Sequence, residues 1–240
     1  MVEVGGVLEI EHLAAGYGEV QVIWDLGLTV GSGEVVALLG ANGAGKTTLL
    51  KVISGVLRPS GGSVKFHGCE LSGLGPEQVV KSGISHIPEG RQLFSGMTVE
   101  ENLVMGAYTR STRGLSSGLE RIYEIFPELS NKRKRQAGTL SGGEQQMCAV
   151  GRGLMSDPKL LLIDELSLGL APVVVERLVR AVMEVHQQRE LDILFVEQDV
   201  QLALEVATRA YVMESGRIVK QGASQVLMDD PAVRQAYLGL

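Results

Sequence analysis

One segment constrains the fold of this chain more than any other, the glycine-rich run Gly40-Ala41-Asn42-Gly43-Ala44-Gly45-Lys46-Thr47. It follows an apolar stretch expected as a strand, Glu34–Leu39, and precedes a helical pattern that ends near Leu57. Glycines let successive backbone N–H groups surround a phosphate, a lysine adds positive charge, and a threonine hydroxyl binds Mg²⁺. A strand, loop and helix of this composition predict a nucleotide site in an α/β domain. The residues expected to contact the nucleotide are Gly40, Asn42, Gly43, Ala44, Gly45, Lys46, Thr47 and Thr48.

Two acids follow a second apolar strand. Leu160–Ile163 is a short apolar run, and Asp164 and Glu165 come directly after it. The carboxyl ends of buried parallel strands are where α/β sheets bind ligands. Asp164 is suited to hold Mg²⁺ through its water shell, and Glu165 to polarise an attacking water. An ordinary strand ending in a surface acid pair would look the same, but beside the glycine-rich loop we favour the catalytic interpretation.

A second phosphate-binding pattern lies further along the chain, in Leu140-Ser141-Gly142-Gly143-Glu144-Gln145-Gln146. Ser141 is placed to cap a helix expected over Gln145–Met155, because its hydroxyl accepts a backbone N–H. The two glycines allow a close approach to a bulky anion, which the helix N-terminus attracts. One domain therefore carries two phosphate-binding elements.

The pattern of the remaining residues predicts a layered α/β fold. Three turn-linked strands, 7–13, 20–30 and 34–39, indicate an antiparallel β layer. The stretch 89–138 is more polar and helical, and Thr98-Val99-Glu100-Glu101 opens a helix with a capping box. From residue 160 strands and helices alternate, which favours a parallel sheet. The other expected strands are 63–67, 84–87, 160–164, 191–196 and 210–214, and the other expected helices are 76–81, 119–126, 172–189, 199–207 and two short ones between Ala223 and Leu240, separated by Pro231.

Composition excludes several classes of function. The 240 residues carry a net charge of −6, which disfavours general nucleic-acid binding. The two cysteines are far apart and form no metal or disulfide pattern, as expected in a reducing cytosol. Met1–Glu9 shows no signal peptide, and no run approaches the roughly 20 apolar residues of a membrane span. The basic run Lys132–Arg135 is interpreted as a solvated loop.

The two nucleotide motifs alone leave open a GTPase, a nucleotide kinase, a helicase or an ABC ATPase. We find no base-reading N-K-x-D element of a GTPase, and a small-metabolite kinase gives no reason for the run Leu140–Gln146. With Gly40–Thr48, Leu140–Gln146 and Leu160–Glu165 in this order, the chain resembles the ATP-binding cassette (ABC) family over essentially its whole length.

The resemblance implies a P-loop ABC cassette with an N-terminal antiparallel β layer and an inserted α-helical subdomain. Residues 1–88 and 139–240 would form the β layer and core, and residues 89–138 the helical subdomain. The cofactors would be ATP and Mg²⁺, and Tyr17 would stack on the adenine. Two cassettes of the family pair head to tail, so the residues Ser141, Gly142, Gly143 and Glu144 would contact the nucleotide of the partner.

Three positions depart from the usual family pattern. Glu89 stands where the family has a glutamine that meets Mg²⁺ and the membrane subunit. Gln198 replaces a histidine that contacts the γ-phosphate; glutamine donates a hydrogen bond but takes up no proton, so Glu165 is left as the expected base. Leu166 replaces a proline that would fix φ just after the acid, which predicts a more mobile loop.

The sequences Pro88–Arg91, Thr98–Leu103 and Val196–Gln198 resemble one branch of the family, the LivF-type cassettes of branched-chain amino acid importers. The branch implies hydrolysis of ATP coupled to transport at the inner face of the plasma membrane. Its partners would be a LivG-type cassette or a second copy, two permeases and, indirectly, a solute-binding protein, with no nucleic acid. Three alternatives stay open: an importer for another amino acid, urea or an amide; a soluble ABC ATPase; and a cassette that binds ATP but scarcely hydrolyses it.

Overall fold

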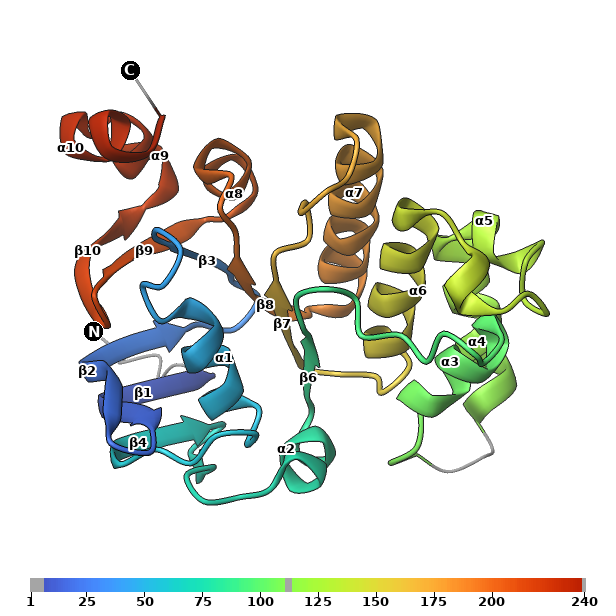
Figure 1. Ribbon diagram of the computed structural model, residues 1–240, viewed down its shortest axis with the longest axis horizontal. Coiled ribbons are helices and arrows are strands. Elements are labelled where there is room, and N and C mark those ends of the chain that lie inside the picture. The colour runs from blue at the N-terminus through green and yellow to red at the C-terminus, as the bar shows by residue number, and fades with distance from the viewer. Residues whose placement is uncertain (1–6, 111–113, 239–240) are drawn as a thin grey trace. The chain divides into compact units, whose positions relative to one another are not determined.

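The computed structural model describes residues 7–110 and 114–238 (Figure 1). Contacts divide the chain into two compact units. The first holds the described residues of Met1–Ser82 and Asp192–Leu240, and the second those of Gly83–Leu191. Residues 1–6, the greater part of the stretch in which no signal peptide is expected, lie outside the described residues.

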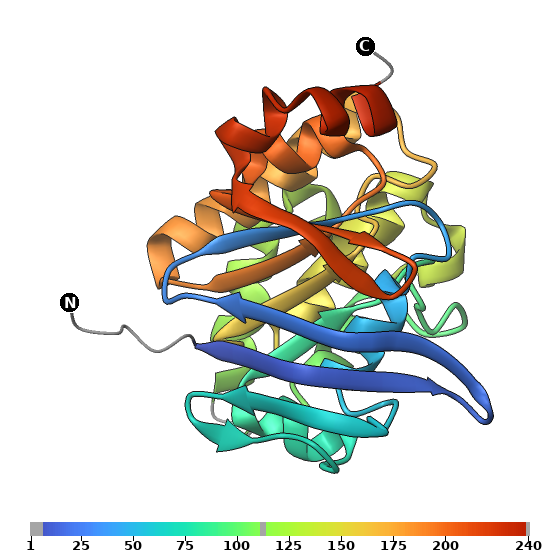
Figure 2. The ribbon, with the colours of Figure 1, turned by 90° about the vertical axis from the view of Figure 1, so that its left-hand side faces the viewer.

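An antiparallel sheet forms one layer of the first unit (Figure 2). Its order is β2 (Val20–Val30), β1 (Leu8–Tyr17), β4 (Gly61–Phe66) and the short β5 (Cys69–Glu70). Ile10 pairs with Leu28 on one side and with Val64 on the other. The prediction of an N-terminal antiparallel layer is therefore confirmed for the first two strands.

The third opening strand belongs to a different sheet. In the first unit β3 (Val35–Leu39) lies between β8 (Asp192–Val196) and β9 (Arg209–Glu214) and runs parallel to both. The strand β10 (Arg217–Ala223) closes this edge antiparallel to β9. The expectation that residues 34–39 join the antiparallel layer is wrong, because every residue of β3 is apolar and buried, which requires cover on both faces.

A charged cluster fastens the start of β3. Arg209 donates to the two carboxylate oxygens of Glu34 at 2.7 and 2.8 Å and to the backbone oxygen of Thr29 at 2.8 Å. Glu34 also accepts from the backbone N–H of Gly31 at 2.7 Å. The cluster joins the end of β2, the beginning of β3 and β9, so it fixes the base of the strand that leads to the glycine-rich loop.

The helices of the first unit are α1 (Lys46–Ile53), α2 (Pro76–Ser82), α8 (Val200–Val206), α9 (Ser224–Met228) and α10 (Pro231–Val233), followed by the π-helical segment η3 (Arg234–Leu238). The helix after the glycine-rich loop ends four residues earlier than its pattern predicts, since Gly55 has a φ of 73°. Within the described residues, no helix combines the length and the apolar character needed to cross a bilayer.

The second unit packs helices beside two parallel strands. The strands are β6 (Ile84–Ile87) and β7 (Leu160–Asp164), and the helical segments are α3 (Val99–Gly106), α4 (Leu115–Ile125), α5 (Pro127–Ser130), η2 (Ala137–Thr139), α6 (Gly142–Leu154) and α7 (Pro172–Arg189). The predicted capping box is present, with Thr98 accepting from the backbone of Glu101 and Glu101 accepting in return. The division into residues 89–138 and a core stays a prediction.

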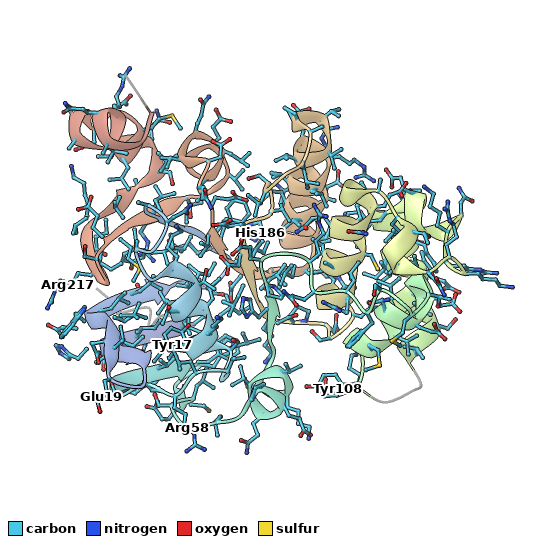
Figure 3. All side chains as sticks on the ribbon, viewed as in Figure 1. Tyr17, Glu19, Arg58, Tyr108, His186 and Arg217 are labelled. Atoms are coloured by element: carbon cyan, nitrogen blue, oxygen red, sulfur yellow. The ribbon has the colours of Figure 1, made fainter. Side chains whose placement is uncertain are left out.

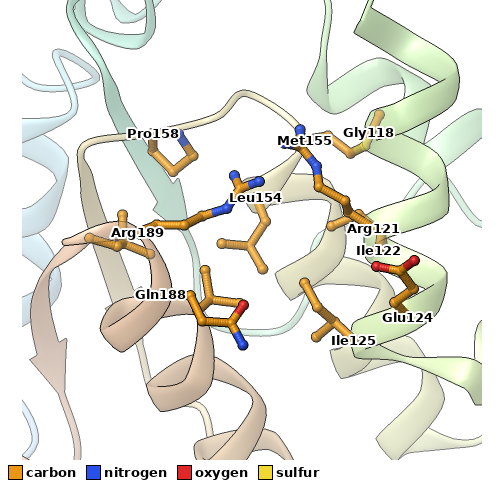
Figure 4. A pocket seen from close by; sticks show the side chains of 12 residues that line it. Gly118, Arg121, Ile122, Glu124, Ile125, Leu154, Met155, Pro158, Gln188 and Arg189 are labelled. Carbon is orange, nitrogen blue, oxygen red and sulfur yellow. The ribbon is translucent and has the colours of Figure 1, made fainter.

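A pocket lies within the second unit, between the C-terminal parts of α6 and α7 and the helix α4 (Figure 4). Ile122, Ile125 and Leu154 supply apolar side chains, and Arg121 and Arg189 supply charged ones. None of the residues predicted to bind nucleotide lines this pocket.

Candidate functional site

The glycine-rich loop has the backbone that its sequence predicts. Gly43 has a φ of 81° with open space where a side chain would stand, and a Cβ on Gly45 would come within 2.7 Å of the Met213 side chain. Lys46 is 5% exposed, and its Nζ donates to the backbone oxygens of Gly40 at 2.7 Å and Ala41 at 3.1 Å. The lysine therefore lies along the inside of the loop, and Thr47 and Thr48 follow it in the first turn of α1.

Tyr17 lies at the end of β1, next to α1 (Figure 3). Its hydroxyl is 3.4 Å from the hydroxyl of Thr48, and the ammonium of Lys51 lies 5.7 Å from the centre of the ring. The side chain stays 45% exposed. An exposed aromatic ring thus lies beside the first turns of α1, and its stacking on adenine stays a prediction.

The parallel register brings Gln198 to the edge of the sheet where the loop lies. Leu38 of β3 pairs with Val196 of β8, and each strand end is followed by its candidate residues, the loop from Gly40 and Gln198. Gln198 is exposed, and Asp199 after it caps α8 by accepting from Leu202 N at 3.0 Å. Gln198 thus lies in the turn between β8 and α8.

In the second unit, acidic residues follow the ends of two paired parallel strands in the same way. Ile87 of β6 pairs with Ile163 of β7, and both Glu89 and Glu165 stand two residues beyond that pair. Asp164 is fully buried and Glu165 is 8% exposed. Glu165 has a φ of 53°, a left-handed conformation that is costly for a residue with a side chain and that collects at functional sites. Leu166 after it is buried, and the greater mobility expected there stays a prediction.

The structure confirms the predicted cap of α6, the helix that begins within Leu140–Gln146. We call this run the signature run and α6 the signature helix. The helix α6 begins at Gly142, three residues before the expected Gln145. Ser141 Oγ accepts from the backbone of Glu144 at 3.4 Å, and a carboxylate oxygen of Glu144 accepts from Ser141 N at 3.1 Å. The backbone N–H groups of Ser141 and Glu144 are thereby both satisfied, and Gly142 and Gly143 lie between them in the first turn of the helix.

Sequence reasoning missed how Glu144 is held. The ammonium of Lys132 binds the other carboxylate oxygen of Glu144 and lowers the pKa of that carboxyl below its ordinary value. The solvated interpretation fits Arg133, Lys134 and Arg135, which are exposed, but is wrong for Lys132. A lysine and a glutamate twelve residues apart give no local signal of pairing.

Sequence reasoning also missed the position of Arg91. Its Nη1 donates to Gln145 Oε1 at 3.2 Å, and its guanidinium lies against Gly142 of the signature run. The motif match at Pro88–Arg91 pointed to this residue, but no spacing rule connects it to α6.

The candidate residues divide between the two units. The first holds Tyr17, the loop 40–48 and Gln198, and the second holds Glu89, the run 141–144, Asp164 and Glu165. Among the residues that the structure describes, no group of three or more His, Cys, Asp or Glu forms a metal site of its own. Carboxylate and hydroxyl oxygens are nevertheless the donors that Mg²⁺ prefers, and the open backbone at Gly43 suits a phosphate. The residues therefore fit a nucleotide and its Mg²⁺.

Comparison with known proteins decides the family. The model of the ABC transporter family matches residues 23–167, which contain the glycine-rich loop, the signature run and the two acids. The chain belongs to the ABC transporter family. It is accordingly an ATPase of the ABC type, with the P-loop fold expected from its sequence.

Relatives and solved structures agree with this assignment. The high-affinity branched-chain amino acid transport ATP-binding protein BraG of Pseudomonas aeruginosa is 42% identical, over 97% of this chain and 100% of its own. The probable branched-chain amino acid transport ATP-binding protein LivF of Archaeoglobus fulgidus is 35% identical, over 98% and 99%. A crystal structure of the ADP conformation of an ABC transporter cassette covers 98% of this chain and 100% of its own, with a TM-score of 0.84 and 28% identity. The LivF-type resemblance is thus confirmed.

Similarity extends to family members with another cargo. The lipopolysaccharide export system ATP-binding protein LptB of Haemophilus influenzae is 33% identical, over 97% of both chains. Full-length similarity therefore shows that this chain is the ATP-binding subunit of an ABC transporter. It does not by itself identify the transported solute.

Proposed function

We propose that this ABC cassette hydrolyses ATP to energise uptake of branched-chain amino acids. The assignment of the solute rests on the similarity to BraG, which is named for branched-chain amino acid transport and matches over 97% of the chain. The departures at Glu89 and Gln198 support the same branch, because the resemblance to LivF-type cassettes includes both positions.

The first unit binds the nucleotide in this proposal. The ring of Tyr17 stacks on the adenine, and the N–H groups of residues 40–48 surround the phosphates. Lys46 gives up its contacts with the carbonyl oxygens of Gly40 and Ala41 and moves its ammonium to the β- and γ-phosphates. The ammonium is already inside the loop, so this exchange requires a side-chain movement and no refolding.

Hydrolysis is assigned to the acids of the second unit and to Gln198. Glu165 accepts a hydrogen bond from the attacking water and takes its proton, while Gln198 donates a hydrogen bond to the γ-phosphate. Mg²⁺, when bound with ATP, neutralises developing charge on the phosphate oxygens. Thr47, Asp164 and Glu89 would hold this ion, because hydroxyl and carboxylate oxygens are the ligands that Mg²⁺ prefers.

A second cassette completes each site in this proposal. Ser141, Gly142, Gly143 and Glu144 contact the nucleotide held by that cassette, which is a second copy or a LivG-type chain. Two membrane permeases bind the pair at the inner face of the plasma membrane, a solute-binding protein delivers the amino acid, and residues 89–138 act as the helical subdomain. No nucleic acid is bound, since the net charge is −6.

The variant Glu165→Gln tests this function. Removing a general base lowers a rate by about 10²- to 10⁴-fold, and the amide keeps the size of the side chain. We expect ATP hydrolysis by the purified cassette to fall by that factor, and gel filtration with ATP to reveal a dimer that the wild type loses through hydrolysis. Glu184→Gln, at an exposed position of α7, is the matched control and should behave as wild type.

The same variant tests the solute in cells. Replacing the gene by the Glu165→Gln form should abolish uptake of radiolabelled leucine, while the Glu184→Gln form should leave it unchanged. Loss of urea uptake with normal leucine uptake would exclude the branched-chain assignment. A wild-type rate of ATP hydrolysis in Glu165→Gln would exclude Glu165 as the general base. The absence of any ATP-dependent dimer, alone or with the second cassette, would exclude a nucleotide site shared between two cassettes.

A further inference from the structure

The loop after β6 has an unusual backbone. Gly90, Arg91 and Gln92 are successive residues in the left-handed region, with φ of 74°, 67° and 45°. Residues with side chains take up this conformation at a cost and keep it only where surrounding contacts hold them. The conformation of this loop is therefore stabilised by contacts with other parts of the chain.

The signature helix supplies one part of these contacts. Arg152 of α6 donates to the backbone oxygen of Gln92 at 2.8 Å and to that of Arg91 at 3.1 Å. Its guanidinium also lies 5.7 Å from the ring centre of Phe94. One arginine thus holds two carbonyl groups of the strained loop against the far end of α6.

The side chain of Arg91 supplies the other part at the opposite end of α6. Besides its bond to Gln145, its guanidinium would lie 3.3 Å from a Cβ built on Gly142. A glycine at that position lets the planar guanidinium pack directly on the first turn of the helix. A Cβ at this position would require the guanidinium to shift by a few tenths of an ångström.

Gln145 connects this contact to the signature run. Its Oε1 accepts from Arg91, while its Nε2 donates to the backbone oxygens of Leu140 at 3.3 Å and Ala137 at 3.4 Å. The amide uses its acceptor for the loop and its donors for the segment before Ser141. Arg91, Gln145 and the backbone of Leu140 therefore form one hydrogen-bonded chain.

We propose that Arg91 is a positioning residue that joins the loop of Glu89 to the first turn of the signature helix, so that both move as one piece. This rests on the proposed function, in which Glu89 belongs to one nucleotide site and Ser141 to the site on the second cassette. A displacement of the loop is then transmitted directly to Ser141 and Gly142, because the contacts of Arg91 link the two segments rigidly. Lysine would transmit it poorly, because it lacks the planar fork that both bonds Gln145 and packs on Gly142.

A double-mutant cycle tests the link. The variants are Arg91→Met, Gln145→Leu and the two together, measured as kcat and KM for ATP hydrolysis with the full-length chain and any second cassette it requires. We expect each single variant to lower kcat about tenfold and the double variant to lower it no further, because both remove the same connection. KM for ATP should stay within about twofold, because the phosphate loop is untouched.

Controls separate this role from simple loss of structure. Lys134→Met removes an exposed positive charge from the same unit and should leave kcat unchanged. Arg91→Lys should recover part of kcat, and each single variant should lower the thermal midpoint by no more than about 4 °C, the effect of one lost hydrogen bond. Should Arg91→Met not fold, Gln145→Leu and Arg91→Lys still carry the test.

Three outcomes would overturn the proposal: wild-type kcat in Arg91→Met, additive losses in the double variant, or a change confined to KM. Each of them leaves the proposed function standing if Glu165→Gln is inactive and dimerises with ATP. Failure of Glu165→Gln to do so would instead count against the proposed function.

Discussion

Cys148 is a buried thiol within the signature helix, whereas Cys69 is exposed on β5. Burial raises the pKa of the Cys148 thiol to about 11. The thiolate is the reactive form, so near neutral pH the side chain is both inaccessible and almost entirely protonated. A cysteine in this position acts as a small apolar residue of the helix.

This difference predicts selective modification of one thiol by thiol–disulfide exchange. In the folded protein one thiol should react rapidly with an aromatic disulfide reagent at pH 8, and two should react after denaturation. Cys69→Ser should remove the rapid phase and leave Cys148 unreactive. Rapid modification of Cys148 in that variant would show that α6 opens readily in the native state.

The backbone conformation of Glu165 depends on the structure around it. A left-handed backbone at a buried acid costs about 1–3 kcal/mol, which the neighbouring structure must offset. The strand Leu160–Asp164 directly before it is buried along its whole length and supplies that support. The acid therefore lies, largely buried, directly after a fully buried strand.

At the scale of elements, two helices of the second unit begin with the same N-terminal capping motif. Thr98 caps α3 and Ser141 caps α6, each with a glutamate three residues later that completes a capping box. A capping serine or threonine contributes typically about 1 kcal/mol over alanine. The two helices thus offer a matched pair in which one cap belongs to the proposed nucleotide contact and the other does not.

The pair predicts separable effects. Thr98→Ala and Ser141→Ala should each lower the free energy of unfolding by about 1 kcal/mol, measured by urea titration. Ser141→Ala alone should also lower ATP hydrolysis, because its hydroxyl is assigned to the second cassette's nucleotide. Ser141→Asp should keep the cap and still lose activity by repelling phosphate. Full activity in Ser141→Asp would contradict that assignment.

Element boundaries show where local pattern stops being sufficient. The helix expected at 119–126 begins at Leu115, and the short elements β5, α5 and β10 were not expected. The strand β10 alternates exposed and half-buried residues, with none fully buried, and it is stabilised by pairing with β9. Such elements depend on a neighbouring strand or helix, so sequence periodicity alone does not reveal them.

At the scale of the whole molecule, nucleotide binding is linked to stability. A ligand that binds only the folded protein stabilises it by about 2.7 kcal/mol at 100 times its Kd. For a chain of this size that corresponds to roughly 5–10 °C in the thermal midpoint. We expect this shift with Mg-ATP in the Glu165→Gln background, where hydrolysis does not consume the ligand.

Two measurements check the origin of the shift. Lys46→Ala should abolish it, because the ammonium is assigned to the β- and γ-phosphates, and EDTA should reduce it by removing Mg²⁺. An equal shift in Lys46→Ala would place the nucleotide elsewhere than the loop 40–48. Lys134→Met again provides a variant with one positive charge fewer and no expected effect.

The sequence by itself determined the family, the phosphate loop, the two acids and the caps of α3 and α6. These features depend on residues close together in the chain, whose spacing defines a loop, a strand end or a helix start. Tertiary structure decided the partners of β3, the pairing of Lys132 with Glu144 and the contact of Arg91 with Gln145. Those contacts join residues far apart in sequence, and their free energy arises only when folding brings the elements together.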